Sequence, residues 1–109
     1  MGSAALVRSL ANVWLVALLL ACASGGVAPH PELSVAWRDY LALPSVRALA
    51  IAGDPGRHRW VTAASGGHAT RAEAEASALS ECKIRRRERR IQDACVLYAV
   101  QAEIVWRGR

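Results

Sequence analysis

The chain has 109 residues, a formal net charge of +5 and 53% hydrophobic residues. A single hydrophobic core typically needs on the order of 100 residues, so this length excludes a second domain of ordinary size. Charge is unevenly distributed, because residues 1–28 contain only one charged side chain, Arg8, whereas most later ten-residue blocks contain several. This shift predicts an N-terminal targeting segment followed by one small domain.

Residues 1–21 have the features of a signal peptide. Arg8 and the amino terminus supply positive charge, and residues 10–21 form an apolar stretch of the length found in signal-peptide cores. A transmembrane helix needs about 20 apolar residues, and Gly25 and Gly26 interrupt the stretch before it reaches that length. The sequence therefore predicts export.

Two processing sites are possible at the end of this segment. Leu19-Leu20-Ala21-Cys22 resembles the lipobox of bacterial lipoproteins, in which the cysteine becomes the lipidated first residue of the mature chain. Ala21-Cys22-Ala23 also fits the A-x-A site of the ordinary signal peptidase. Lipidation of Cys22 would anchor the domain to a membrane, and Ala23 after it would favour the outer membrane. We expect a periplasmic or outer-membrane location rather than free secretion.

Both processing routes leave two cysteines in the folded part, Cys82 and Cys95. An even pair in an exported domain predicts a disulfide. Closing a loop of this size would stabilise the fold by about 3 kcal/mol in the chain-entropy model. A metal site is the weaker alternative, since the three histidines show no recognisable zinc spacing relative to the cysteines. We expect no metal and no cofactor.

The first elements of the mature chain are predicted to be a tether and a short helix. Residues 22–33 are rich in small residues, Gly and Pro and lack apolar periodicity, which predicts a flexible tether. Residues 34–43 have apolar residues at helical spacing. Ser34 can cap this helix and Pro44 ends it. The folded domain is therefore expected to span residues 34–109.

A β-hairpin is predicted next. Residues 47–52 alternate, with Leu49 and Ile51 on one face, and a second strand is expected over about residues 59–64. Asp54-Pro55-Gly56 supplies the turn, since Pro presets its dihedral and Gly tolerates a positive φ.

A long helix follows the hairpin. Thr70 and Glu73 form a capping box that predicts its start. Its apolar stripe is expected to contain Ala72, Ala76, Leu79 and Cys82. Beyond Cys82 the stripe ends, so residues 83–90 are expected to project from the core or to fray into a loop.

Residues 95–100 and 104–106 are apolar or β-branched runs that predict a second hairpin. The element order is then short helix, β, β, helix, β, β. This order predicts an α+β fold, in which a small antiparallel sheet (ββαββ) carries one helix on a face and the disulfide joins that helix to the third strand.

The last 65 or so residues resemble a family of small secreted proteobacterial disulfide domains of unknown function. The resemblance lies in a strand, a Gly-bearing strand, an Ala-Leu-x-x-Cys step in a helix, and a Cys followed by a Leu-Tyr-Ala-Val strand. The matching segments here are Ala48–Ala52, Trp60–Gly67, Ala78–Cys82, Cys95–Val100 and Val105–Trp106. The basic insert between the two cysteines departs from the family pattern.

Relatives in this family are sometimes labelled aminolevulinate synthase-like. A pyridoxal-phosphate enzyme needs a large two-domain fold and a buried Schiff-base lysine. The only lysine of this chain is Lys83, which lies in the arginine-rich run. We therefore reject that activity for this protein.

Enzymatic chemistry finds little support in the sequence. A nucleophile needs an adjacent base and an orienting third group, and no recognised motif supplies them. Ser65-Gly66-Gly67-His68 is the nearest candidate, and we interpret it as a turn between strand and helix. Asp54 is interpreted as a turn former. Cys82 and Cys95 do not form a C-x-x-C motif, which disfavours a redox-active pair.

The basic run is the strongest candidate for a binding surface. Closely spaced guanidinium groups suit phosphates and carboxylates. The candidate contact residues for an anionic partner are Lys83, Arg85, Arg86, Arg87, Arg89 and Arg90. The alternative is a solvated helix end in which Glu81 pairs with Arg85. The aromatic residues Trp37, Tyr40, Trp60, Tyr98 and Trp106 are expected to lie mainly in the core, with a ligand-stacking patch as the alternative.

These observations predict an exported envelope protein or lipoprotein that acts as a non-enzymatic binding module. Its partner is expected to be another envelope protein or an anionic surface, and export disfavours nucleic acid. A small periplasmic enzyme or redox protein is the alternative.

Overall fold

The computed structural model describes residues 27–57 and 59–108. The predicted signal peptide and Cys22 lie outside the described residues. The elements are η1 (Pro31–Leu33), α2 (Ser34–Leu41), β1 (Ala48–Gly53), β2 (Trp60–Ser65), α3 (Arg71–Glu88), β3 (Cys95–Val100) and β4 (Glu103–Ile104). Among the described helices, none has the length and apolar content needed to cross a membrane.

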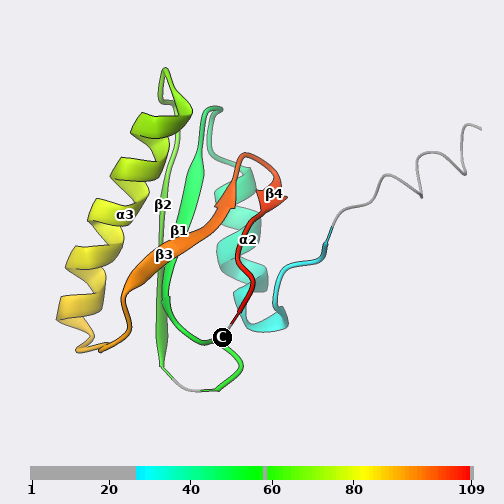
Figure 1. Cartoon of the computed structure of the whole chain (residues 1–109). Coiled ribbons are helices and arrows are strands. Elements are labelled where there is room, and N and C mark those ends of the chain that lie inside the picture. Colours follow the sequence, from blue (N-terminus) through cyan, green and yellow to red (C-terminus); the bar gives the residue numbers. More distant parts are fainter. Residues whose placement is uncertain (1–26, 58, 109) are drawn as a thin grey trace, which may run out of the picture.

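The four strands form one antiparallel sheet in the order β2-β1-β3-β4, with the long α3 on one face and α2 on the other (Figure 1). The predicted α+β class is thus confirmed. β1 is the central strand, and every residue along it is buried. Because side chains alternate between the two faces of a strand, β1 contributes to two separate cores.

The first core lies between the sheet and α3 and is built mainly from small side chains. Alternate residues of β1, such as Ala50 and Ala52, pack with Ala74, Ala78 and Cys82 of α3. The predicted stripe was right for Cys82 but wrong for its first residues, since Ala72 and Ala76 are exposed. Alanine occupies every second position from 72 to 78, so hydrophobicity alone did not identify the buried face.

The second core lies on the opposite face and is aromatic. Leu49 and Ile51 of β1 pack with Tyr40 and Tyr98, both almost fully buried. Trp37, Trp60 and Trp106 are partly buried against this cluster. The aromatic residues are therefore core residues for the most part, as predicted. The Tyr40 hydroxyl donates to the Gln101 carbonyl at 2.6 Å, and burial raises the pKa of Tyr40.

The N-terminal elements differ in detail from the prediction. Leu33, which we placed in the tether, is fully buried, so the end of that segment packs on the domain. Ser34 does not cap α2, because the turn of η1 runs directly into the helix and places Leu33 at the N-cap position without a side-chain cap.

The long helix starts where the sequence predicts, and the Thr70 hydroxyl accepts a hydrogen bond from the Glu73 amide. Of the two predicted outcomes for its end, the first is observed: residues 83–88 continue the helix without fraying, and all of their side chains except that of Arg86 are exposed. The side chains of Arg85 and Arg86 donate to the carbonyls of Thr62 and Asp93, which holds these last turns against the sheet and the following loop.

The C-terminal hairpin is shorter than predicted. β3 has the predicted bounds, but β4 contains only Glu103 and Ile104. The amides of Val105 and Trp106 both donate to the Tyr98 carbonyl, so the chain leaves the ladder and covers the aromatic core.

Candidate functional site

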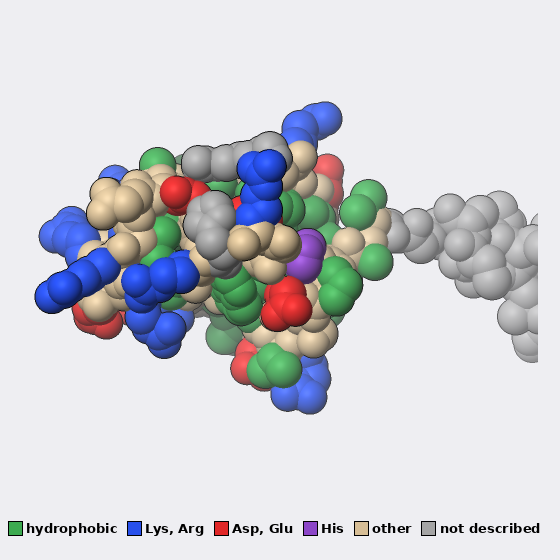
Figure 2. Space-filling view, turned by 90° about the horizontal axis from the view of Figure 1, so that it is seen from below, with side chains coloured by type: hydrophobic (Ala, Val, Ile, Leu, Met, Phe, Trp, Pro, Cys, Tyr) green, Lys and Arg blue, Asp and Glu red, His purple; other side chains and the backbone are tan. Residues whose placement is uncertain are grey.

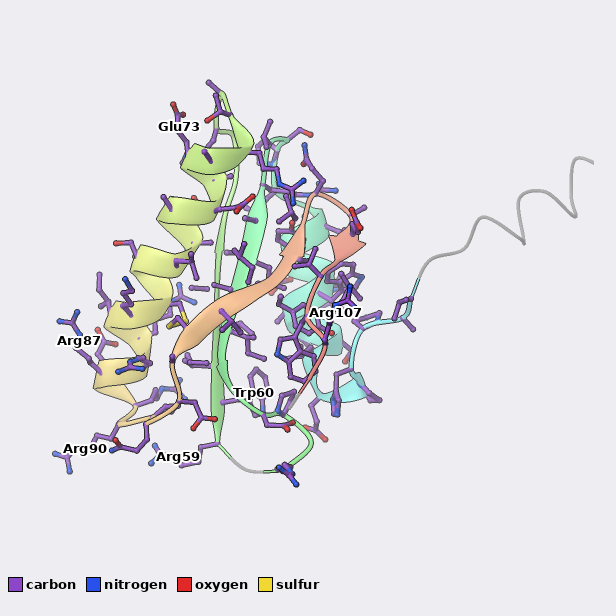
Figure 3. All side chains as sticks on the ribbon, in the orientation of Figure 1. Arg59, Trp60, Glu73, Arg87, Arg90 and Arg107 are labelled. Atoms are coloured by element: carbon purple, nitrogen blue, oxygen red, sulfur yellow. A yellow bond between two sulfur atoms is a disulfide. The ribbon has the colours of Figure 1, made fainter. Side chains whose placement is uncertain are left out.

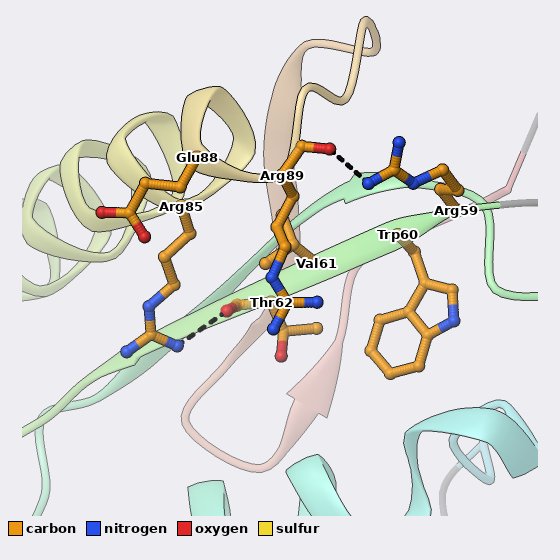
Figure 4. Close-up of a pocket in the computed structure, with 7 residues that line it drawn as sticks. All are labelled: Arg59, Trp60, Val61, Thr62, Arg85, Glu88 and Arg89. Atoms are coloured by element: carbon orange, nitrogen blue, oxygen red, sulfur yellow. Dashed lines mark hydrogen bonds between the residues drawn. The ribbon is translucent and has the colours of Figure 1, made fainter.

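A groove of about 860 Å³ opens between β2 and the last turns of α3 (Figure 4). Its lining residues are Arg59, Trp60, Val61, Thr62, Arg85, Glu88 and Arg89. Three of these seven side chains are guanidinium groups and one is a carboxylate. The groove therefore carries an excess of positive charge.

Two elements bring the three arginines together. Arg85 and Arg89 are four residues apart at the end of α3, so they lie on the same side of the helix, the side that faces β2. Arg59 immediately precedes β2 and reaches the groove from the sheet. The groove thus depends on the packing of α3 against the start of β2.

Hydrogen bonds across the groove hold its walls together. Nη1 of Arg85 donates to the Thr62 carbonyl at 2.9 Å, and Nη2 of Arg59 donates to the Arg89 carbonyl at 2.5 Å (Figure 4). A guanidinium has five N–H donors, so each of these side chains keeps donors for a ligand. The predicted Glu81–Arg85 ion pair is also present, with Nε of Arg85 3.6 Å from the Glu81 carboxylate.

Helical geometry divides the predicted basic run into three groups. Arg85 and Arg89 line the groove. Lys83, Arg87 and Arg90 are exposed, and Arg87 and Arg90 point away from the sheet (Figure 3). The side chains of the run therefore do not all face the groove.

The remaining member, Arg86, has a structural role. Its Nη1 donates to the Asp93 carbonyl at 2.7 Å, which connects α3 to the loop before β3. Arg59 lines the groove but was not among the residues predicted to contact a partner. The predicted element order contained a signal for it, because a helix that follows a strand after a short turn and packs back along it brings its end beside the start of that strand.

Viewed from the end at which α3 terminates, the surface shows several Lys and Arg side chains gathered on the α3 side (Figure 2). Acidic side chains are interspersed among them. The positive field of the groove therefore belongs to a wider basic end of the domain.

The predicted disulfide is present. Cys82 and Cys95 are bonded with their Cα atoms 6.1 Å apart, and Cys82 is fully buried. Because Cys82 lies one turn before Arg85, the bond fixes the part of α3 that carries Arg85 and Arg89 to the start of β3.

The Ser65–His68 pair is closer than a simple turn requires. The Ser65 hydroxyl lies 2.5 Å from Nε2 of His68 and 2.8 Å from the Ser77 hydroxyl. Hydroxyl and imidazole at this distance have the arrangement of a nucleophile and its base. However, among the residues that the structure describes, no carboxylate hydrogen-bonds to the His68 ring, and neither described cavity is lined by Ser65 or His68.

This contact also has a structural explanation. The backbone of His68 exchanges two hydrogen bonds with Val46, and Ser77 belongs to α3. The contact thus joins the β2–α3 turn to the helix and to the segment before β1. Asp54 has the predicted turn role, since its carboxylate accepts from the Gly56 amide at 2.8 Å.

Within the described parts of the chain, no group of three or more His, Cys, Asp or Glu side chains could hold a metal ion. Comparison with protein-family models, curated proteins and solved structures finds no match. The resemblance to the small secreted disulfide domains therefore stays a prediction, and what the protein binds is inferred from the groove.

Proposed function

We propose that this protein is an exported, non-enzymatic binding module that holds an anionic partner in the groove beside β2. The observation that carries the proposal is the convergence of Arg59, Arg85 and Arg89 beside Trp60 in an open groove. Guanidinium groups form paired, charge-assisted hydrogen bonds with carboxylates and phosphates. The partner is another envelope protein or an anionic surface of the envelope.

The proposed compartment is the periplasm or the outer membrane. It is supported by the signal-peptide pattern of residues 1–21 and by the disulfide, which is typical of oxidising compartments. In this location a nucleic-acid partner is not expected.

Replacing Arg59, Arg85 and Arg89 together by Gln is expected to weaken anion binding by up to about 100-fold, because each exposed charged contact contributes up to about fivefold. We would measure binding to immobilised polyglutamate and to phosphatidylglycerol vesicles across a salt series. Wild-type binding should weaken as salt rises, since the screening length is about 8 Å at physiological ionic strength and shorter above it.

The matched control is the triple Gln variant of Lys83, Arg87 and Arg90. It removes the same number of positive charges, from the end of α3 and the residues just after it, but leaves the groove lining intact. We expect at most about a threefold loss in this control, confined to low salt. Equal losses in both variants would show that net charge, and not the groove, determines binding.

Lipidation of Cys22 is part of the same proposal. If the lipobox is used, the protein should partition into membranes, and Cys22→Ala should release it into the soluble envelope fraction. Fractionation of cells that export the two forms measures this. If the wild-type protein is already fully soluble, Cys22 is not lipidated and the ordinary signal peptidase processes the chain.

The Ser65–His68 contact favours a small periplasmic enzyme as the second candidate function. A fluorophosphonate probe would label an activated Ser65, and His68→Gln would abolish that labelling. Labelling of this kind would favour a hydrolase, whereas unlabelled Ser65 leaves the contact with its structural role in the β2–α3 turn.

A further inference from the structure

β2 forms one edge of the described sheet, and its outer side faces the basic groove. The Thr62 carbonyl accepts the Arg85 guanidinium, so this carbonyl points away from β1. In an antiparallel ladder the N–H and C=O of one residue point to the same side, and successive residues alternate. Trp60, Thr62 and Ala64 therefore direct their amides and carbonyls toward the open edge.

The two edges of the sheet differ in length. β4 has two residues, and the chain after it turns back over Tyr98. β2 has six residues and no strand beyond it among the described residues. An exposed edge of this length is a template for another strand.

We propose that the anionic partner is an acidic polypeptide segment that binds in an extended conformation and adds to β2 as a fifth strand. This inference rests on the proposed function of the groove and names its ligand class. The outward groups of β2 repeat every second residue, a spacing of about 6.8 Å that another extended backbone reproduces. A lipid headgroup or free phosphate would use the arginines alone.

Arg85 makes this edge selective. Its guanidinium donates to the Thr62 carbonyl, which is where the amide of an incoming strand must bind. A charged side chain that occupies the backbone of an edge strand, here from the neighbouring helix, hinders pairing with neutral strands. A carboxylate on the incoming segment can accept the hydrogen bonds of the Arg85 guanidinium instead. The Thr62 carbonyl is then free to accept an amide of the incoming strand. Arg59 and Arg89, at the Trp60 end of the groove, extend the preference for acidic residues along the strand.

The first test uses the full-length protein and a peptide of about eight residues in which Glu alternates with Thr, a length that covers β2. Two N-methylated versions of this peptide each block alternate backbone amides: one version is methylated at the Glu amides and the other at the Thr amides. Only one of these two sets of amides faces β2. The version methylated at that set should bind at least about tenfold more weakly than the parent peptide, because two or more backbone hydrogen bonds are lost. The other should bind within about threefold of the parent peptide. Equal binding by the two versions would overturn strand addition.

The second test changes the protein at one amide. Thr62→Pro removes the N–H that faces the groove, at an edge position where proline is tolerated. Thr62→Val keeps the amide and serves as the control. We expect the Pro variant to bind the peptide about tenfold more weakly than the Val variant, whereas the two variants should bind vesicles equally.

The outcomes separate the two proposals. If the Gln variant of the three groove arginines loses peptide binding while both N-methylated peptides and both Thr62 variants bind equally well, the groove is an anion site but not a strand acceptor. If that Gln variant binds every probe as tightly as the wild type, the proposed function itself is wrong. A Gln-for-Glu version of the peptide should bind wild-type protein at least about tenfold more weakly, and equal binding would contradict the selectivity assigned to Arg85.

Discussion

Replacing Cys82 and Cys95 together by Ala is expected to lower the free energy of unfolding by about 3 kcal/mol. The bond closes a loop with a sequence separation of 13 residues, and its loss returns conformational entropy to the unfolded chain. This is a large share of the total for a domain of this size, because small folds have a net stability of about 5–15 kcal/mol. Denaturant unfolding followed by circular dichroism measures the change.

A reducing agent provides the control for this prediction. It should bring the wild-type protein down to the stability of the double Ala variant and leave the variant itself unchanged. A wild-type protein that is insensitive to reductant under conditions that break the bond would show that packing of Cys82 against the alanine-rich core, and not the cross-link, supplies the stability.

Loss of the disulfide should also impair binding. The bond holds α3 to β3 one turn before Arg85. Without it, the end of the helix that carries Arg85 and Arg89 is less firmly placed beside β2. We expect the double Ala variant to bind polyglutamate more weakly than the wild type even under conditions where both are folded.

Gly53→Ala is expected to destabilise the protein by about 3 kcal/mol or more. Gly53 has φ +91°, and a Cβ there would overlap the Arg59 carbonyl oxygen and lie 2.9 Å from the Trp60 Cα. Gly53 pairs with Trp60 in the sheet, so the clash would push the start of β2 away from β1. Groove binding should fall together with stability, since Arg59 and Trp60 line the groove.

Gly67→Ala is the matched control for this variant. Gly67 also has a positive φ, of +76°, but an added Cβ would meet only Pro44, at 3.9 Å. Its cost should be the backbone strain alone, about 1 kcal/mol. The difference in stability loss between the two variants, measured by thermal or denaturant unfolding, gives the cost of the steric clash at Gly53. Similar losses in both variants would contradict that interpretation.

Features that depend on neighbouring residues were predictable from the sequence. The turn at Asp54, the cap at Thr70 and the strand at Cys95–Val100 each follow from side chains within a few residues of each other. The disulfide was also predictable, because the predicted mature domain contains two cysteines and so has one possible pair.

The composition of the groove was decided by tertiary structure. The sequence presented a basic run over residues 83–90, but the rotation of about 100° per residue along α3 separates Arg85 and Arg89 from Lys83 and Arg87. Which side of the helix faces β2 depends on packing, and the alternating alanines left that side undetermined.

The position of Arg59 in the groove was likewise decided by tertiary packing. Arg59 is separated from Arg85 by 26 residues of sequence, and only the packing of α3 against β2 brings the two side chains to one cavity. The sequence by itself determined the local elements, their order and the covalent cross-link, because each is specified by short-range chemistry. The open edge of β2 and the arginines beside it were decided by the tertiary structure, because burial of the alanine face of α3 against the sheet sets which residues remain at that edge.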